Sequence, residues 1–369
     1  SAIDLGDAGF DIQFGYGLLD IEAALGREQN VEDPPVEPPP PPVETTYTKY
    51  FTWYDTKYSD RLAWILIGNP STTSSLTANI KIGSVVNSNY TVPAGGKVTP
   101  SWTGIQTGPV EISSSKDFYA SQRVSFSGSF NEFAAIDSAS LTNKYYFTWY
   151  DTSRSNRQAW ILIGNPSTTQ TASVNVKIGN QINQNYTIPA GGRITPSFTG
   201  IKNGPVVVTS NINVYTTQRV NYENSFNEYA GIPSSSLTNK YYFTWYDTIR
   251  SNRLAWILIG NPSSSQSAYV NVKIGNSVNQ NFSIPPGGKV TPEWNGIQNG
   301  PVVVTSDINV YTTQRVSYEG SFNEYPGIAS NTLSKQFYFT WYDTSRPDRL
   351  AWILIGNPST TTTATVNIK

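Results

Sequence analysis

The feature that most constrains the fold of this chain is a repeat of fixed length. The string Tyr-Phe-Thr-Trp-Tyr-Asp-Thr occurs four times, always 96 residues apart, with its tryptophan at Trp53, Trp149, Trp245 and Trp341. A second string, Ala-Trp-Ile-Leu-Ile-Gly-Asn-Pro, recurs with the same period. A long fixed period indicates one folded unit copied in tandem. Such an array is more typical of a spacer, adhesin, surface module or filament subunit than of an enzyme, which usually needs one unique site.

Composition excludes several classes of function. The 369 residues include no cysteine, histidine or methionine, which excludes disulfides, thiolate or imidazole metal ligands and catalysis by Cys or His. The net charge is -1 and no basic face is evident, so nucleic acid is not an expected partner. No run of 18 apolar residues predicts a membrane span. Few charges with abundant Ser, Thr, Asn, Gly and Tyr are typical of a protein that is extracellular or at the cell surface.

The chain divides into an N-terminal zone and the array. Leu18, Leu19, Ala23 and Ala24 would share one face of a helix that follows a Gly-Tyr-Gly turn. A Pro-rich run then predicts an extended, semi-rigid linker. The expected divisions are the helical tail 1–27, the linker 28–46, the repeats 47–142, 143–238 and 239–334, and an incomplete fourth repeat 335–369.

Each repeat predicts short antiparallel strands packed as a β-sandwich of about the size of an immunoglobulin domain. Val174, Val176 and Ile178 alternate with polar residues, as in a half-buried strand. The pair Gly179-Asn180 predicts a hairpin turn, and Pro189-Ala-Gly-Gly192 predicts another. In the second repeat the expected strands are 144–151, 158–164, 173–178, 183–188, 193–198, 205–210 and 214–222. We therefore predict an all-β fold of tandem immunoglobulin-like sandwiches, after a short N-terminal helix.

Two features bear on assembly. The strand around Trp160 is apolar on both faces, so its outer face is covered either by a loop of its own repeat or by another repeat. The fourth repeat holds only the first three strands. This pattern fits either a fragment of a longer chain or a subunit whose missing strands come from another chain, which would generate a filament.

The N-terminal zone resembles a known family. Asp4-Leu-Gly and the later run Gly15-Tyr-Gly-Leu-Leu-Asp-Ile-Glu-Ala-Ala-Leu25 are similar to the closing segment of subtilisin-like serine protease domains. The resemblance covers about 25 residues. It implies that the full polypeptide is, or descends from, a secreted subtilase with a C-terminal array. Without histidine the protease triad cannot lie in this chain, so no catalytic residue is assigned.

The array resembles the Trp-Tyr-Asp repeats of secreted bacterial wall and surface proteins. The matching strings in the second repeat are Phe147-Thr-Trp-Tyr-Asp151, Gly164-Asn-Pro166, Pro189-Ala-Gly-Gly192, Gln218-Arg-Val220 and Ser225-Phe-Asn-Glu228. The resemblance covers most of residues 47–369 and implies a location more than a mechanism.

An aromatic and charged cluster recurs in every copy and is the candidate ligand or assembly contact. An aromatic platform with polar neighbours would suit stacking on a sugar, whereas burial in the sandwich core is the alternative. Strand alternation puts Phe147, Trp149 and Asp151 on one side and Thr148 and Tyr150 on the other, which argues against one platform. The residues concerned are Trp149, Tyr150, Asp151, Arg157, Trp245, Tyr246, Asp247 and Arg253.

Two further sets of residues recur. Arg219 and Glu228 could form an ion pair that pins the last strand to the following loop. Asn89, Asn185 and Asn281 begin one glycosylation sequon per repeat and are either glycan sites or ordinary strand residues. No Asp-x-Asp pattern predicts a calcium site, and no metal or cofactor is expected.

The sequence therefore predicts an extracellular structural repeat protein, a surface stalk or filament subunit that self-associates through sandwich contacts or strand sharing. The alternative is a carbohydrate- or cell-wall-binding appendage at the C-terminus of a secreted subtilisin-like protease, with polysaccharide or cell wall as partner. No enzymatic activity is expected of this chain itself.

Overall fold

The computed structural model describes residues 45–369 except 127, 223, 224, 299, 319 and 348, together with the backbone of 2, 3, 18 and 19. The chain divides into two compact units, Ser1–Glu44 and Thr45–Lys369. In the first unit, β1 (Ala2–Ile3) pairs antiparallel with β2 (Leu18–Leu19). The helix prediction is therefore wrong for Leu18 and Leu19. The remainder of that predicted helix and the Pro-rich linker lie outside the described residues.

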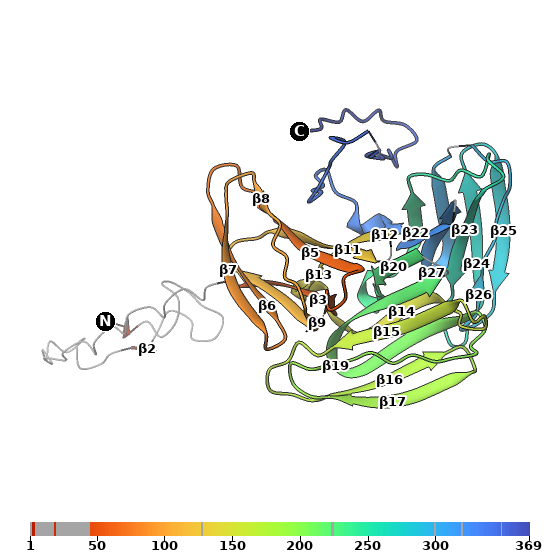
Figure 1. The fold of residues 1–369 in the computed structure, drawn as a ribbon. Helices are drawn as coiled ribbons and strands as arrows, with labels where there is room; N and C mark the ends of the chain where they lie inside the picture. Colours follow the sequence, from red (N-terminus) through yellow and green to blue (C-terminus); the bar gives the residue numbers. More distant parts are fainter. Residues whose placement is uncertain are drawn as a thin grey trace, which may run out of the picture. The chain divides into compact units, whose positions relative to one another are not determined.

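The second unit consists of antiparallel strands that form sandwiches (Figure 1). The all-β prediction is confirmed. In the first repeat the elements are β3 (Tyr47–Phe51), β4 (Tyr54–Asp55), β5 (Arg61–Gly68), β6 (Leu76–Ile82), β7 (Val86–Val92), β8 (Lys97–Val98), β9 (Gln106–Thr107), β10 (Val110–Ser114), β11 (Tyr119–Phe126), β12 (Ser129–Ala134), β13 (Ile136–Asp137) and the 3-10 turn η1 (Ser138–Ser140).

The second and third repeats reuse this plan. The second contains β14 (Thr142–Tyr150), β15 (Arg157–Gly164), β16 (Ala172–Ile178), β17 (Ile182–Ile188), β18 (Arg193–Ile194), β19 (Gly204–Tyr222), β20 (Ser225–Ala230), β21 (Ile232–Pro233) and η2 (Ser234–Ser236). The third contains β22 (Thr238–Phe243), β23 (Arg253–Gly260), β24 (Ala268–Ile274), β25 (Val278–Ile284), β26 (Lys289–Val290), β27 (Val302–Tyr318), β28 (Ser321–Pro326), β29 (Ile328–Ala329) and η3 (Ser330–Thr332).

One long strand organises each sandwich. The first part of β19 pairs with β14 and β16 in one sheet, and its second part pairs with β15 and β20 in the other. In the third repeat β27 takes the same role toward β22, β24, β23 and β28. In the first repeat two strands, β10 and β11, share this role. Strands β14, β15 and β16 therefore pair with the later long strand and not with one another.

Local sequence patterns account for most of these strands. In β16, Val174, Val176 and Ile178 are buried and the residues between them are more exposed, so the predicted half-buried strand is confirmed. Gly179 begins the turn to β17 with φ 49°, a left-handed conformation that glycine adopts without steric cost. The predicted turn at Gly179-Asn180 is thus also confirmed.

The strand prediction is wrong at the end of the repeat. Residues 205–210 and 214–222 belong to one strand, β19, because the polar stretch between them stays extended where the strand passes from one sheet to the other. The predicted strand 193–198 shrinks to β18, which covers only two residues. Conversely, a loop is expected after the last strand, but Ser225–Ala230 forms β20, which pairs with the end of β19.

The outer faces of the Trp-Ile-Leu-Ile strands pack on neighbouring repeats. Leu258, on the face of β23 opposite Ile257 and Ile259, is fully buried in a cluster with core residues of the second repeat. Trp256 packs on the same cluster. Of the two possibilities for this face, cover by another repeat is therefore the one found.

Candidate functional site: the joint between repeats

Consecutive repeats meet through two sets of residues at equivalent positions. We call Tyr50, Thr52 and Trp53, with their equivalents 96 residues apart, the edge motif. We call Tyr215, Thr217, Arg219 and Glu228, with their equivalents, the acceptor face. The edge motif of one repeat contacts the acceptor face of the next, and this contact is the joint.

A buried carboxylate lies at the centre of the joint. Glu228 accepts hydrogen bonds from Thr217 (2.7 Å) and from Thr52 of the preceding repeat (3.1 Å). Arg219 donates to its other oxygen from Nε (2.9 Å) and Nη2 (2.6 Å). The predicted Arg219–Glu228 ion pair is confirmed, and with a glutamate side chain only 1% exposed it is a charge-assisted buried pair rather than a surface one.

The next joint repeats this geometry. Glu324 accepts from Thr313 at 2.9 Å and from Thr148 at 3.0 Å, and Arg315 donates to it at 3.0 and 2.6 Å. The Tyr229 hydroxyl adds a further bond at 3.1 Å. Every acceptor position of these two carboxylates therefore faces a donor, which is what a buried charge requires.

Aromatic side chains surround the polar centre. Tyr50 stacks on Tyr215 with ring centroids 4.6 Å apart, and Tyr146 stacks on Tyr311 at 4.7 Å. The guanidinium of Arg315 lies over Trp149 at 3.8 Å. At the first joint Arg193 lies over Trp53 at 3.8 Å. Such cation–π contacts strengthen when the site excludes water.

Neighbouring hairpins add directional hydrogen bonds. The backbone N–H of Glu228 donates to Asn131 Oδ1 (3.1 Å), and that of Phe226 donates to Ser129 Oγ (2.9 Å). The second joint repeats both bonds, from Glu324 to Asn227 at 3.2 Å and from Phe322 to Ser225 at 2.8 Å. Specific polar contacts therefore set the register between β12, β20 and β28.

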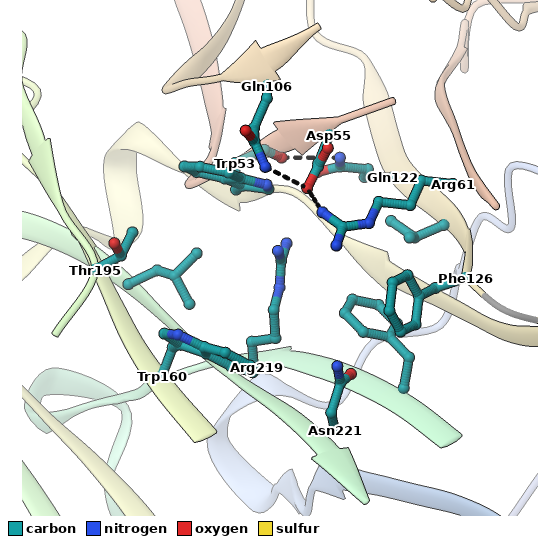
Figure 2. A pocket seen from close by; sticks show the side chains of 13 residues that line it. Trp53, Asp55, Arg61, Gln106, Gln122, Phe126, Trp160, Thr195, Arg219 and Asn221 are labelled. Carbon is teal, nitrogen blue, oxygen red and sulfur yellow. Dashed lines mark hydrogen bonds and ion pairs between the residues drawn. The ribbon is translucent and has the colours of Figure 1, made fainter. Parts of the chain in front are cut away.

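A cavity of about 210 Å³ lies within the first joint (Figure 2). Figure 2 shows Asp55 joined to Arg61 and Gln106 on one wall and the guanidinium of Arg219 reaching up from the other. Among the described residues, Trp53 Nε1 and Gln122 Oε1 are buried without a hydrogen-bond partner. A cavity of this size with several polar groups in its wall can hold ordered water, which would satisfy such atoms.

The structure separates the predicted aromatic cluster into different environments. Trp149 is 5% exposed and belongs to the joint, whereas Tyr150 and Tyr246 lie in the cores of their sandwiches. The Tyr150 hydroxyl donates to the carbonyl of Ala159 at 2.7 Å. Because Trp149 and Tyr150 are buried, they do not present a stacking platform for a sugar in this structure.

The predicted alternation along this strand is wrong. Phe147 and Tyr150 lie in the sandwich core, whereas Thr148 and Trp149, which alternation assigns to opposite faces, both contact the next repeat. The register of β14 against β19 shifts between Phe147 and Tyr150, and an irregularity of this kind re-aims the following side chains.

The charged members of the cluster form short-range ion pairs. Arg157 donates to Asp151 at 2.9 Å, and Arg253 lies 2.8 Å from Asp247. Arg253 also lies over Trp245, with 5.0 Å to the ring centroid. These pairs hold the loop before β15 or β23 against the edge motif and so support the joint from within each repeat.

The sequon asparagines occupy an exposed sheet edge. Asn185 on β17 accepts from Asn175 at 2.8 Å, and Asn89 and Asn281 make the same bond in their repeats at 2.8 Å. All three asparagines are exposed and so are accessible for glycosylation. A glycan at these positions stays a prediction.

Sequence reasoning missed the threonines of the edge motif and the Ser and Asn residues of the hairpins. Thr52 and Thr148 are fully buried, yet threonine is common in any strand. The equivalents of Thr148, Glu324 and Arg315 do recur together in the copies. Recent copies resemble one another at every position, however, so recurrence alone does not single out the residues of the joint.

A third joint joins residues beyond the third repeat to the first repeat. Thr340 donates to Glu132 at 2.7 Å and lies 2.6 Å from Ser121. Tyr338 stacks on Tyr119 at 4.9 Å, and Arg123 lies over Trp341 at 3.5 Å. The edge motif of residues 338–341 thus occupies the acceptor face of the first repeat in the same way.

Alkaline pH is expected to unfold the array in one step with tyrosine ionisation. Burial raises the pKa of Tyr54, Tyr145, Tyr241 and Tyr246 from the ordinary 10.0 to about 12. The folded state favours the neutral phenol, so this stabilisation is complete below pH 10 and is lost as the pH rises through about 12. Phenolate absorbance and circular dichroism should change together in that window. Ionisation of these tyrosines near pH 10 in a folded protein would contradict the assignment.

Comparison with known proteins identifies no relative of this chain. The chain has no significant match among protein-family models, curated proteins or solved structures. Within the described residues, no group of three or more His, Cys, Asp or Glu side chains could hold a metal ion, and no helix is long and apolar enough to cross a membrane.

Proposed function

We propose that this chain is an extracellular structural repeat protein, a surface stalk or filament subunit. The observation that supports the proposal most is the recurrence of one joint at three places, with Thr or Ser, Glu, Arg, Trp and stacked Tyr in the same positions. Recurring residues such as Trp149, Arg315 and Glu324 lie between repeats and hold them together. This use is the one expected of a mechanical or spacing element.

The alternative, a carbohydrate- or wall-binding appendage of a secreted subtilisin-like protease, receives less support. It requires an exposed aromatic groove in each repeat, and Trp149, Tyr150 and Tyr246 are buried. Tyr269 is 66% exposed on β24, but Thr77 and Ser173 take its place in the other repeats. Apart from the backbone of Leu18 and Leu19, the resemblance to a subtilase tail falls on residues outside the described part, so the link to a protease stays a proposal.

The test is the light-scattering mass of residues 1–369 after size exclusion at increasing concentration. Self-assembly predicts a mass that grows with concentration without reaching a fixed oligomer. A mass of one chain at every concentration would reject assembly by this chain and favour the appendage.

A further inference from the structure

The first joint differs from the second in how its arginine meets its tryptophan. In the second joint the Arg315 guanidinium lies 3.8 Å from the centroid of the Trp149 ring. The equivalent distance at the first joint, from Arg219 to Trp53, is 5.8 Å. The first joint is therefore the more open of the two at this point, and Trp53 and Arg219 both line its cavity of about 210 Å³.

A difference between the copies accounts for this opening. Arg193 lies 3.8 Å from the centroid of the Trp53 ring and so takes the place that Arg219 would otherwise fill. The third repeat has Lys289 at the equivalent position, and this lysine donates to Asn203 at 2.7 Å. A planar guanidinium stacks on an aromatic ring, whereas a compact ammonium does not stack. The arginine at position 193 therefore keeps the cavity open.

Unpaired polar atoms gather around this cavity. Among the described residues, six buried side-chain nitrogen or oxygen atoms have no hydrogen-bond partner, and four of the six belong to residues that line it. Two are donors, Trp53 Nε1 and Arg61 Nε, and two are acceptors, Gln122 Oε1 and Asn221 Oδ1. Because a buried polar group without a partner is costly, this concentration points to a molecule that both donates and accepts hydrogen bonds.

The sequence of the first repeat creates one of these unpaired atoms. In the second repeat the Tyr229 hydroxyl donates to Gln218 Oε1 at 2.8 Å. The first repeat has Phe133 at the position of that tyrosine, so the equivalent Gln122 lacks this donor. The polar demand of the cavity is thus a property of the first joint and not of every joint.

The size and the apolar walls of the cavity limit what it can hold. Its volume is several times the roughly 30 Å³ that one water occupies in the liquid, and it is below the roughly 300–1,000 Å³ of pockets for drug-sized ligands. The aromatic rings of Trp53, Trp160 and Phe226 supply apolar surface. Gln106 is exposed and Asn221 is half-buried, so the cavity reaches solvent. A single ring-sized molecule fits these dimensions.

The charges in and behind the walls favour a neutral molecule. Arg61 pairs with Asp55, and Arg219 pairs with Glu228, so each of these arginines already has a carboxylate as counter-ion. Figure 2 shows the guanidinium of Arg219 pointing from the second repeat toward the wall that carries Asp55 and Arg61. A ligand between these walls meets hydrogen-bonding groups rather than an uncompensated charge.

We propose that the first joint binds one neutral pyranose unit of a glycan. A sugar hydroxyl both donates and accepts, so hydroxyls could accept from Trp53 Nε1 and Arg61 Nε and donate to Asn221 Oδ1. The apolar face of the sugar ring would pack on the aromatic walls. This is one site, unlike the groove in each repeat that a wall-binding appendage would present, and it does not depend on self-association of the chain.

Saturation-transfer difference NMR of the full chain with the methyl glycosides of glucose, galactose and N-acetylglucosamine tests the site. We expect transfer to at least one of them. Asn221→Ser installs the residue that the third repeat has at Ser317, and loss of one acceptor should weaken binding about fivefold. The reverse exchange at the second joint, Ser317→Asn, should leave binding unchanged. Absence of transfer to all three glycosides, or transfer that Asn221→Ser does not reduce, would overturn the proposal.

The indole signal of Trp53 in a proton–nitrogen correlation spectrum provides a second readout. Trp53→Phe identifies this signal because it removes the Nε1–H group, and Trp149→Phe identifies the equivalent signal of the second joint. The glycoside should shift the Trp53 signal and leave that of Trp149 in place. A cavity that holds water only would leave both signals unchanged, and a shift caused only by the acidic methyl glucuronide would reject a neutral sugar as the ligand.

Discussion

Replacing Glu324 by alanine is expected to destabilise the chain by about 3–5 kcal/mol, the cost of removing one partner from a buried ion pair. Its side chain is 1% exposed and accepts bonds from Arg315, Thr313 and Thr148. Loss of the carboxylate leaves the guanidinium of Arg315 desolvated without a counter-ion. The measurement is the change in unfolding free energy from denaturant titration.

Glu132→Ala is the matched control for that substitution. Glu132 makes the same bonds with Arg123 and Thr340, but its side chain is 22% exposed, so water can replace part of what is lost. We expect roughly half the effect or less, in line with weaker ion pairs at exposed sites. Equal losses for the two variants, or a loss under about 1 kcal/mol for Glu324→Ala, would contradict a buried joint.

Replacing Trp149 by alanine is expected to cost about 3–5 kcal/mol, because it removes a large buried side chain and leaves a cavity between two repeats. Trp149 packs near Phe322, with centroids 6.5 Å apart, and beneath Arg315. The loss should appear in thermal or denaturant unfolding of the whole array.

Trp245→Ala provides the comparison, since the two tryptophans occupy equivalent positions in different surroundings. Trp245 is half-buried and has Arg253 as its cation partner within the described residues. A loss of about 1 kcal/mol is expected there, as for a partly exposed side chain. Matching losses at both positions would mean that the contribution comes from within the repeat and not from the joint.

Local patterns in the sequence predict much of the fold, because apolar and polar residues alternate along a sandwich strand as its side chains alternate between buried and exposed positions. Val174, Val176 and Ile178 do so in β16, and Gly179 marks its turn. The continuity of β19 could not be predicted, since the polar stretch Ser210-Asn-Ile-Asn between its two parts has the composition of a turn. That stretch stays extended only because the strand must cross between sheets, which is a tertiary requirement.

The joint was less predictable than the sandwich. Thr148 acquires its role from Glu324, 176 residues away in the sequence, and no local pattern encodes a contact of that range. The irregularity in β14 also redirects Trp149 and Tyr150 from the faces that alternation assigns to them. By contrast, Arg219 and Glu228 face each other across a single hairpin, and this short-range pairing is why their ion pair could be predicted.

A double-mutant cycle across the second joint tests the central claim most directly. Trp149→Ala, Arg315→Ala and the double variant are compared with the unmodified chain by denaturant unfolding. If the two side chains stabilise each other across the joint, the coupling free energy should be about 1–2 kcal/mol, as for a desolvated cation–π contact. Additive losses, with a coupling near zero, would contradict a joint in which these residues bind one repeat to the next.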